Sequence, residues 1–284
     1  MKKVTVYITT KNRPKDFSRA LDSVINQTYS NLEIIVVDDG SSPVNSSLNK
    51  NFCSKDNRVV YVRNEESVGA PAARNIAISL ANGFFVTGLD DDDFFEIRRV
   101  ELFVDKWNEL NQNSHNIPVG FLYSQYKIFT SKEKYFFSKF PCVATSDAIL
   151  ISNCVGNQIF APLENWFAAG LFDEKMPAWQ DLELFYRFCK RVGCGILVNN
   201  PSYVFFDIRS SDRISTKGVD RIKRAYNCFL EGNSYLSSSD KAWLYMQIFS
   251  KYYGFRPSGK DVAYFFSLRP SVKQILKFLL RFVF

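Results

Sequence analysis

Short apolar runs alternate with helix-like segments through the first hundred residues of the chain. The runs are rich in β-branched and aromatic residues, as buried strands are, and they cover residues 4–9, 32–37, 59–62 and 84–89. Residues 17–27 carry apolar positions at helical spacing, and residues 70–80 form a helix-like segment of small residues. Because strand and helix alternate with short turns, the pattern predicts an α/β fold with a mainly parallel, Rossmann-like sheet and helices on both faces.

The pattern is less regular after residue 100 and becomes helical towards the end of the chain. Predicted helices and strands follow one another at residues 102–110, 119–129, 134–140, 182–192 and 196–206. Beyond residue 211 the apolar spacing is wholly helical. We therefore expect two halves of one main domain and a C-terminal helical extension, at residues 1–100, 101–215 and 216–284.

Polar side chains follow three of the predicted strands at the point where each strand ends. Thr9-Thr10 closes the first strand, Asp38-Asp39 follows the second, and Asp90–Asp93 follows the fourth. Ligands of open α/β sheets bind outside the carboxyl ends of the strands. The three clusters are therefore expected to line one crevice.

The tetrad Asp90–Asp93 is the clearest candidate for a metal site. Adjacent carboxylates repel one another unless a cation is present, and Mg²⁺ commonly joins one or two carboxylates to substrate phosphates. If strand geometry continues past Leu89, alternate residues point the same way, so Asp90 and Asp92 are expected to face one ligand. A solvated acidic loop or a helix N-cap is the alternative.

Two further positions have the chemistry to hold a nucleotide. A carboxylate at Asp39 can accept hydrogen bonds from a base N–H or from ribose hydroxyls, although Asp-Asp-Gly-Ser is also good turn sequence. Residues 69–75 carry small side chains where a helix begins, so the backbone can approach a ligand and Arg74 can pair with a phosphate. The alternative is an ordinary helix start with a surface arginine.

Composition narrows the classes of function. A net charge of +7 suggests an anionic partner, yet no nucleic-acid motif is present. The single His115 lies in a polar stretch, which argues against a histidine-based mechanism, and six cysteines without a CxxC pair give no zinc pattern. The N-terminus lacks a signal-peptide core and no apolar run approaches the ~20 residues of a membrane span, so we expect a cytoplasmic protein.

The motifs of this chain and their order resemble those of the family-two glycosyltransferases with the GT-A fold. The resemblance is strong over residues 1–100 and traceable to about residue 215. The segments that carry it are Thr9–Pro14, Asn26–Tyr29, Glu33–Ser41, Gly69–Asn75 and Leu89–Asp93.

The resemblance implies roles for individual residues. Thr9 and Asp39 correspond to uracil-pocket residues, and Arg74 to an arginine that helps to hold the nucleotide. Asp90, Asp91 and Asp92 correspond to the DxD region, which contacts ribose and binds Mn²⁺ or Mg²⁺ between the phosphates. Asp92 is the expected principal metal ligand, with Asp90 beside it. The full set expected to bind the sugar nucleotide is Thr9, Arg13, Asp39, Arg74, Asp90, Asp91 and Arg213.

The second half resembles the same family at Trp179–Phe185. The family has a Glu-Asp motif here whose aspartate is the catalytic base; Gln180 replaces the glutamate, and the aspartate is retained as Asp181. N-capping of the helix 182–192 by Asp181 is the alternative, and both can hold. If Asp181 is not the base, Glu183 or Asp173 is the next candidate.

Residues 207–216 resemble a loop that closes over the donor phosphates. Relatives often carry a histidine in this loop, and this chain has none. Asp207 or Arg209 is expected to substitute for it, and Arg213 to contact the pyrophosphate.

The resemblance implies a metal-dependent, inverting transfer of a hexose from a UDP-sugar to a glycan hydroxyl. By their frequency in the family, UDP-glucose and UDP-galactose are the favoured donors, and a lipid-linked acceptor in O-antigen or capsule synthesis is the setting that the resemblance implies. Three alternatives remain: a non-catalytic nucleotide-sugar-binding module, a sugar nucleotidyltransferase and, from the positive charge, a nucleic-acid binder. The acidic crevice argues against the last of these.

The final segment, residues 271–284, has the pattern of a membrane-surface helix. Its apolar positions recur at helical spacing and its basic positions every four residues; they are Val272, Ile275, Leu276, Leu279 and Val283, and Lys273, Lys277 and Arg281. Such a segment can lie among headgroups on the inner face of a membrane. The alternative is a helix that packs against the body with its cations in water.

Overall fold

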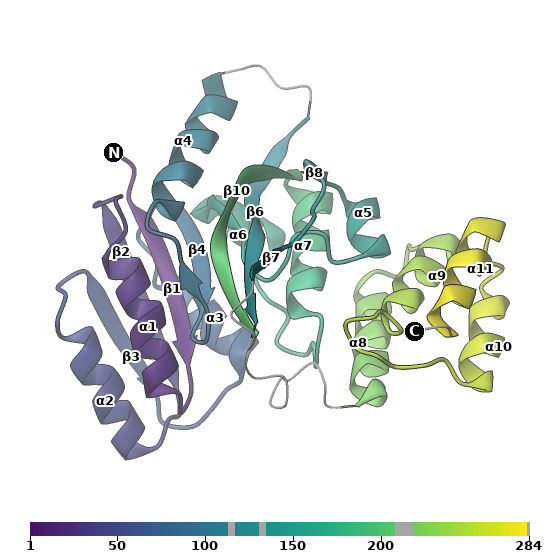
Figure 1. Ribbon diagram of the computed structural model, residues 1–284, viewed down its shortest axis with the longest axis horizontal. Helices are drawn as coiled ribbons and strands as arrows, with labels where there is room; N and C mark the ends of the chain where they lie inside the picture. The colour runs from purple at the N-terminus through teal and green to yellow at the C-terminus, as the bar shows by residue number, and fades with distance from the viewer. Residues whose placement is uncertain (113–116, 131–134, 208–217, 283–284) are drawn as a thin grey trace.

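The computed structural model describes residues 1–112, 117–130, 135–207 and 218–282 of the chain (Figure 1). These residues form a ten-stranded sheet in the order β3-β2-β1-β4-β9-β6-β10-β5, with β7 beside β6 and β8 beside β10. The first four neighbours in this order are mutually parallel. They are β3 (Val59–Asn64), β2 (Leu32–Asp39), β1 (Val4–Thr10) and β4 (Phe85–Asp90).

A short antiparallel strand joins the two halves of the sheet. Strand β9 (Phe160–Pro162) pairs with β4 on one side and with β6 (Val119–Thr130) on the other. Strand β6 runs parallel to β10 (Cys194–Asp207). The remaining strands are short and antiparallel to their neighbours: β5 (Phe94–Phe95), β7 (Tyr135–Phe137) and β8 (Val143–Ala144).

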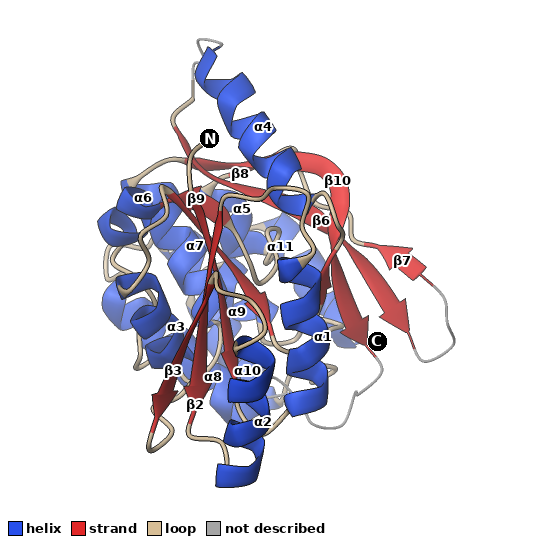
Figure 2. Ribbon diagram, turned by 90° about the vertical axis from the view of Figure 1, so that its left-hand side faces the viewer, coloured by secondary structure: helices blue, strands red, loops and turns tan. Residues whose placement is uncertain are grey.

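Helices cover both faces of the sheet (Figure 2). Alternation along β1 assigns its side chains to two separate cores, since Val6 and Ile8 belong to one apolar cluster and Tyr7 to the other. On the Val6 face lie α1 (Pro14–Ile25), α2 (Pro43–Cys53) and α4 (Arg99–Gln112). On the Tyr7 face lie α3 (Ala70–Ser79), α5 (Ser146–Ile151), α6 (Leu163–Ala169) and α7 (Gln180–Arg191).

The C-terminal part of the chain forms a helical extension at one end of the molecule (Figure 1). Its elements are α8 (Val219–Gly232), α9 (Ser238–Gln247), α10 (Gly259–Ser267), α11 (Val272–Leu279) and the 3₁₀ turn Leu280–Phe282. Capping boxes begin α9, α10 and α11 at Ser237, Ser258 and Ser271. Its apolar side chains belong to the same cluster as α7, so the extension continues the core of the Tyr7 face.

The expected fold class is confirmed: the sheet is mainly parallel, helices cover both faces, and a helical extension follows. The predicted strand at 134–140 is shorter than expected, because only Tyr135–Phe137 pair with β6. Over the residues that the structure describes, no helix is both long and apolar enough to cross a bilayer.

Candidate active site

The carboxylate of Asp90, at the end of β4, is held by three side chains. Its Oδ1 accepts hydrogen bonds from Arg74 Nη2 at 3.0 Å and Gln158 Nε2 at 2.8 Å. Its Oδ2 accepts one from Asn157 Nδ2 at 2.6 Å. Asp90 therefore links β4 and α3 to the loop that leads into β9.

The acidic tetrad turns instead of continuing the strand. Strand β4 ends at Asp90, and the Asp93 N–H donates to the Asp90 carbonyl at 3.1 Å, which closes a turn. Strand alternation therefore ends at Asp90 and does not extend to Asp92, so it no longer supports the expectation that these two carboxylates face one ligand. Asp92 instead lies 3.1 Å from Arg13 Nη1, which also reaches Asp91 at 3.2 Å.

Within the tetrad, Asp92 is the carboxylate best presented to a ligand. Its side chain is 50% exposed, against 10% for Asp91. Burial raises the pKa of Asp91 to about 7, although Arg13 opposes that shift. Over the described residues, no three His, Cys, Asp or Glu side chains gather into a ready-made metal cluster. Metal binding by Asp92, with Asp90 as a second ligand, stays a prediction.

Asp39 is buried and fully engaged by protein donors. Its carboxylate accepts from Asn64 Nδ2 at 2.9 Å, Ser67 Oγ at 2.6 Å and the N–H groups of Val68 and Gly69 at 2.8 and 3.0 Å. Burial alone would raise the pKa of Asp39, but these four bonds bring it below its usual value. The carboxylate fixes the loop that leads into α3. The turn chemistry considered for this motif is made by its neighbour Asp38, whose Oδ1 accepts from the Ser41 N–H at 2.9 Å.

Thr9 lies one residue before the end of β1 and is half-buried. The register places it between Val37 of β2 and Asp90 of β4, so it faces the same carboxyl edge as the acidic clusters. Its neighbour Thr10 donates from Oγ1 to Asp91 Oδ2 at 2.8 Å. The three strand ends thus meet at one edge, as expected from the sequence.

Arg74, in the first half of α3, bridges the end of β4 and the start of α7. Besides Asp90, its Nη1 contacts Asp181 Oδ1 at 3.4 Å and Gln180 Oε1 at 3.5 Å. Burial lowers the pKa of this guanidinium, but Asp90 and Asp181 raise it by more, so Arg74 stays charged. Arg74 is therefore not the surface arginine of the alternative interpretation, since its side chain is 10% exposed.

Asp181 lies in the first turn of α7 and points at Arg74. The N-cap of this helix is Trp179, at φ 60° and without a side-chain cap, so the N-capping alternative for Asp181 is wrong. Burial raises the pKa of Asp181 to about 7; Arg74 lowers it and Asp90 raises it further. A carboxylate with a pKa near 7 is matched to proton transfer at neutral pH.

Glu183 and Asp173, the two alternative candidates for the base, are engaged in other contacts. Glu183 is buried and holds Arg187 in a bidentate pair, with Nε and Nη2 at 2.5 and 2.6 Å. That pair stabilises the α6–α7 packing, because Arg187 also donates to the carbonyls of Ala169 and Leu171. Asp173 accepts from the N–H of Lys175 in a turn. Asp181 is the carboxylate that faces Arg74 and Asp90.

Several side chains around the site were not predicted from the sequence. Asn157 and Gln158 hold Asp90, and Tyr203 donates from its hydroxyl to Asp93 Oδ2 at 2.8 Å. The glycine at position 88, within β4, could have indicated that other side chains pack closely against this strand. A Cβ there would lie 2.1 Å from Gln158 Oε1 and 2.3 Å from the Tyr7 ring.

The extension also reaches the site. Trp179 donates from Nε1 to Tyr253 Oη at 2.9 Å, and Arg221 donates from Nε to the Pro177 carbonyl at 2.7 Å. The loop before Asp181 is therefore anchored by residues from beyond the main domain. Arg209, Arg213 and His115 lie outside the described residues, and so does the side chain of Asp207 at the end of β10.

This fold and this carboxylate-rich edge define a glycosyltransferase of the GT-A class. The chain belongs to glycosyl transferase family 2, whose family model matches residues 5–154. The family resemblance and the expectation of an enzyme are thereby confirmed.

Curated relatives agree with this family, and a solved structure agrees with the fold. WcaA of Escherichia coli, named for colanic acid biosynthesis, is 32% identical over 67% of this chain and 67% of its own length. WfgD of E. coli, named as a UDP-Glc:alpha-D-GlcNAc-diphosphoundecaprenol beta-1,3-glucosyltransferase, is 30% identical over 45% of this chain and 47% of its length. The crystal structure of S. aureus TarS 1-349 in complex with UDP-GlcNAc superposes over 98% of this chain and 79% of that one, with a TM-score of 0.64 and 18% identity.

Proposed function

We propose that the protein transfers a hexose from a UDP-sugar to a hydroxyl of a glycan acceptor, with inversion at the anomeric carbon. The observation that carries the proposal is the position of Asp181. This carboxylate, with its pKa raised to about 7, lies 3.4 Å from an arginine that also holds the end of β4. The position of this carboxylate, beside the edge where α/β proteins bind nucleotides, supports its assignment as the base.

In the proposed reaction, Asp181 accepts the proton of the acceptor hydroxyl. The acceptor oxygen then forms a bond to the anomeric carbon as the bond from that carbon to the UDP oxygen breaks. Attack from the face opposite the leaving group converts an α-linked donor into a β-glycoside. General-base assistance of this kind contributes roughly 10²–10⁴-fold to the rate.

The donor is proposed to lie along the carboxyl edge. Thr9 and Asp39 are assigned to the uracil pocket, and Arg13, Arg74 and Arg213 to the phosphates. Asp39 already binds four protein donors, so its contribution to the pocket is chiefly to hold the loop before α3 in place.

Mn²⁺ or Mg²⁺ is proposed to bind at Asp92. Carboxylate oxygen is the ligand type that these ions prefer, and the half-exposed Asp92 can be released from Arg13 to accept one. When bound, the ion would neutralise charge on the departing UDP. Asp91 supports the turn that presents Asp92, through its bonds to Thr10 and Arg13.

Surface-polysaccharide synthesis is the proposed setting, with a lipid-linked acceptor at the inner face of the cytoplasmic membrane. The names of WcaA and WfgD support this setting, the second through its diphosphoundecaprenol-linked acceptor and UDP-glucose donor. UDP-glucose and UDP-galactose remain the favoured donors for this chain.

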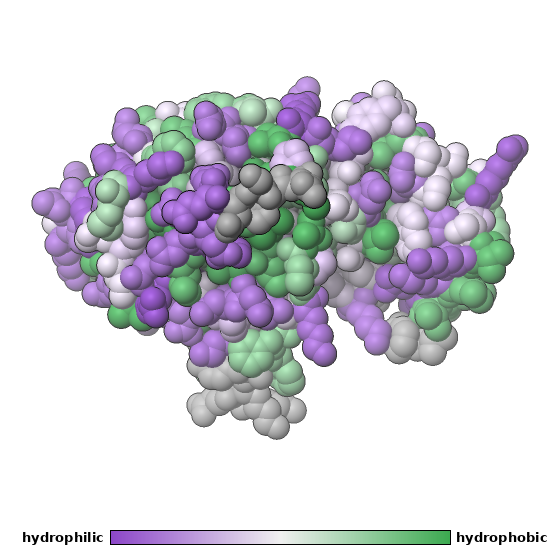
Figure 3. All heavy atoms as spheres, turned by 90° about the horizontal axis from the view of Figure 1, so that it is seen from above, coloured by the Kyte–Doolittle hydropathy of each residue, from purple (hydrophilic) through white to green (hydrophobic). Residues whose placement is uncertain are grey.

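The proposed membrane contact is the exposed face of α11 and its surroundings. Val272, Leu276 and Leu279 are 74%, 60% and 51% exposed, while Phe278 and Gln274 attach the other side of the helix to the extension. Figure 3 shows apolar surface gathered at the end of the molecule that carries α10 and α11. The helix therefore packs against the body and still leaves most of its apolar stripe outside.

The direct test is a donor screen with purified protein, Mn²⁺ and a panel of sugar nucleotides, in which UDP release is measured. Turnover of UDP-glucose or UDP-galactose is expected. Binding of UDP without turnover of any donor would favour the non-catalytic module. Release of pyrophosphate from UTP and a sugar 1-phosphate would favour the nucleotidyltransferase.

A further inference from the structure

Trp179, two positions before Asp181, has a backbone conformation that is rare for a large side chain. Its φ of 60° and ψ of 24° lie in the left-handed region. That region costs free energy for a residue with a Cβ, so it persists only where the surrounding structure enforces it. The Trp179 carbonyl accepts a hydrogen bond of the first turn of α7, from the Glu183 N–H at 2.9 Å. The conformation of Trp179 therefore sets where α7 begins and, with it, the place of Asp181.

A tyrosine of the helical extension holds the side chain of Trp179. The indole Nε1 donates to Tyr253 Oη at 2.9 Å, across 74 positions of the chain. Trp179 is buried, and a buried indole N–H needs an acceptor. Tyr253 lies in the turn after α9, where its N–H donates to the Ser250 carbonyl at 3.1 Å and its ring stacks on Phe255. Burial raises the pKa of Tyr253, so its hydroxyl stays neutral.

The extension is attached to the main domain at other points, which fixes Tyr253 relative to α7. Gln247 of α9 donates to two carbonyls at the end of α5, at 2.9 and 2.7 Å. Arg221 of α8 donates to the carbonyl of Pro177, two residues before Trp179, at 2.7 Å. The loop before the proposed base is thus held by the extension through both its backbone and its indole side chain.

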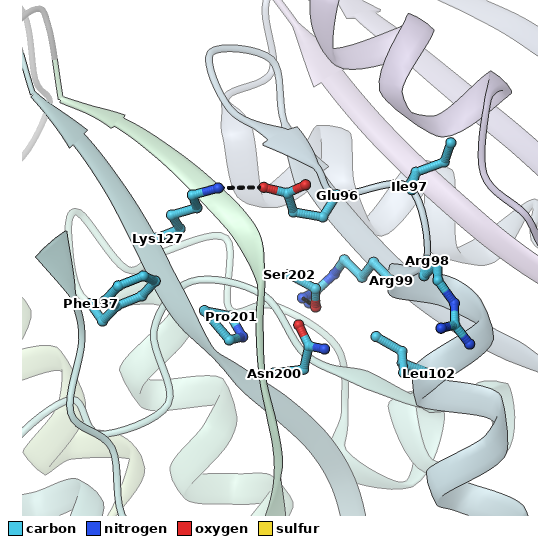
Figure 4. A pocket seen from close by; sticks show the side chains of 10 residues that line it. All are labelled: Glu96, Ile97, Arg98, Arg99, Leu102, Lys127, Phe137, Asn200, Pro201 and Ser202. Atoms are coloured by element: carbon cyan, nitrogen blue, oxygen red, sulfur yellow. Dashed lines mark hydrogen bonds and ion pairs between the residues drawn. The ribbon is translucent and has the colours of Figure 1, made fainter. Parts of the chain in front are cut away.

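The acidic turn after β4 has its own supports within the main domain. Glu96, three residues after the tetrad, pairs with Lys127 of β6 at 3.0 Å, beside the cavity drawn in Figure 4. The Glu96 N–H also donates to the carbonyl of Ser202 on β10 at 2.9 Å. Neither of these two contacts involves the extension. A change at Tyr253 is therefore expected to disturb the start of α7 and to leave the acidic turn in place.

We propose that Tyr253 is a positioning residue for the base: through its bond to Trp179 it holds the first turn of α7 so that the Asp181 carboxylate faces Arg74. The distance from Asp181 Oδ1 to Arg74 Nη1 is 3.4 Å, so a small shift of this turn separates the two groups. Gln180 Oε1 lies 3.5 Å from the same nitrogen and depends on the same turn. The inference rests on the proposed role of Asp181 as the base, and it makes the extension a part of the catalytic apparatus.

The test compares Tyr253→Phe with the wild type, both as the full chain. The substitution removes one hydroxyl and keeps the ring, so the indole N–H of Trp179 loses its acceptor. We expect kcat for UDP release from UDP-glucose to fall by roughly tenfold to a hundredfold, with the dissociation constant of UDP in Mn²⁺ changed by less than about threefold. A loss of stability alone would not separate these two quantities.

Two further variants make the result specific to the bond. Trp179→Phe removes the donor and keeps an aromatic ring, and because both residues act through one bond, the double variant should be no slower than the slower single variant. Tyr264→Phe is the matched control. It also removes one hydroxyl from the extension, one that bonds to Tyr226 at 3.1 Å, and it should keep the wild-type kcat. If either single variant is unfolded by circular dichroism, the other carries the comparison.

Crystal structures of the wild type and of Tyr253→Phe give a readout that does not need transfer. The contact between Asp181 and Arg74 is expected to be absent in the variant. A Tyr253→Phe protein with a lower Tm but an unchanged kcat and an unchanged contact would overturn the proposal. If the wild type turns over no donor, the proposed function fails, and the two crystal structures still decide whether Tyr253 places Asp181 against Arg74.

Discussion

The guanidinium of Arg74 lies 3.4 Å from the carboxylate of Asp181, although the two residues are 107 positions apart in the chain. The contact joins the helix that follows β3 to the helix that precedes β10. It opposes the effect of burial on Asp181 and leaves the pKa of that carboxyl near 7. Burial and this ion pair together thus determine the pKa of the proposed base, and the ion pair also holds its carboxylate in position.

Replacing Asp181 by Asn should abolish most transfer while leaving UDP-sugar binding in place. The amide has the size of the carboxylate but cannot accept the hydroxyl proton. We expect kcat to fall by about 10²–10⁴-fold, with the dissociation constant for UDP changed by less than about threefold. Single-turnover kinetics and calorimetry on the same preparation measure the two quantities.

Asp173→Asn is the matched control, because this carboxylate makes only a local turn contact to the Lys175 N–H among the contacts the structure describes. It should retain close to full activity. Near wild-type transfer by Asp181→Asn would assign the proton to another group.

The pH dependence of kcat/KM should show one limb that falls on the acid side of about pH 7. The pKa of Asp181 is raised in the free enzyme, so below that pH the carboxyl is protonated and cannot act as a base, and above it the active carboxylate is formed. Arg74→Gln should move the limb to higher pH, since the guanidinium lowers the pKa of Asp181. A profile that stays flat between about pH 5.5 and 8.5 would contradict this assignment.

Asp92→Ala should remove the part of UDP affinity that depends on Mn²⁺. The side chain is half-exposed, so the fold should tolerate its loss. Calorimetry with and without Mn²⁺ measures the difference, with the exposed Asp22→Ala on α1 as control. If Mn²⁺ strengthens UDP binding equally in Asp92→Ala and wild type, the metal is held elsewhere.

Asp39→Asn should destabilise the protein even in the absence of nucleotide. An amide keeps only one acceptor oxygen, so the N–H of either Val68 or Gly69, together with the side chain that shares its oxygen, loses a partner. A loss of about 1–3 kcal/mol in the free energy of unfolding is expected for each buried group left unsatisfied, to be measured in urea.

The pKa of Asp39 is lowered on folding, so its stabilising contribution is present above the unfolded value of about 4. It should disappear only as the pH falls through the lower, folded value. Wild-type stability in Asp39→Asn at pH 7 would mean that the loop holds without these bonds.

Strands at the centre of the sheet could be predicted because both of their faces are buried. Val4, Val6 and Ile8 alternate with residues that are also buried, so β1 is apolar on both faces and its boundaries are clear. Helix α2, by contrast, could not be predicted from its apolar pattern. Its apolar Val44 and Leu48 are exposed, and no apolar stripe marked it.

The sequence predicts where the carboxyl edge of the sheet lies but not which side chains contact one another there. The positions of the acidic clusters follow from strand ends, which local sequence defines. The contacts between clusters do not, since Asn157 reaches Asp90 across 67 positions and Tyr203 reaches Asp93 across 110. The turn after Asp90 likewise depends on a backbone bond that strand periodicity does not indicate.

The exposed face of α11 should bind membranes that contain anionic lipid. Val272, Leu276 and Leu279 face outwards, and Lys273 and Lys277 are exposed beside them. Apolar side chains that enter the headgroup region, together with about 1 kcal/mol for each basic residue, give weak and reversible attachment. Arg281 adds less, since it is only partly exposed and burial lowers its pKa.

Co-sedimentation with vesicles containing anionic lipid tests this face without removing the helix. Leu276→Asp with Leu279→Asp should reduce the bound fraction several-fold, because both side chains are solvent-exposed and their replacement leaves the Phe278 contact in the core. Val44→Asp with Leu48→Asp, two exposed apolar positions on α2, is the matched control and should sediment like the wild type. A chain ending at Pro270 should also lose binding, provided that circular dichroism shows it folded. If the α11 variant and the wild type sediment equally, the helix is not the anchor and its exposed leucines serve another contact.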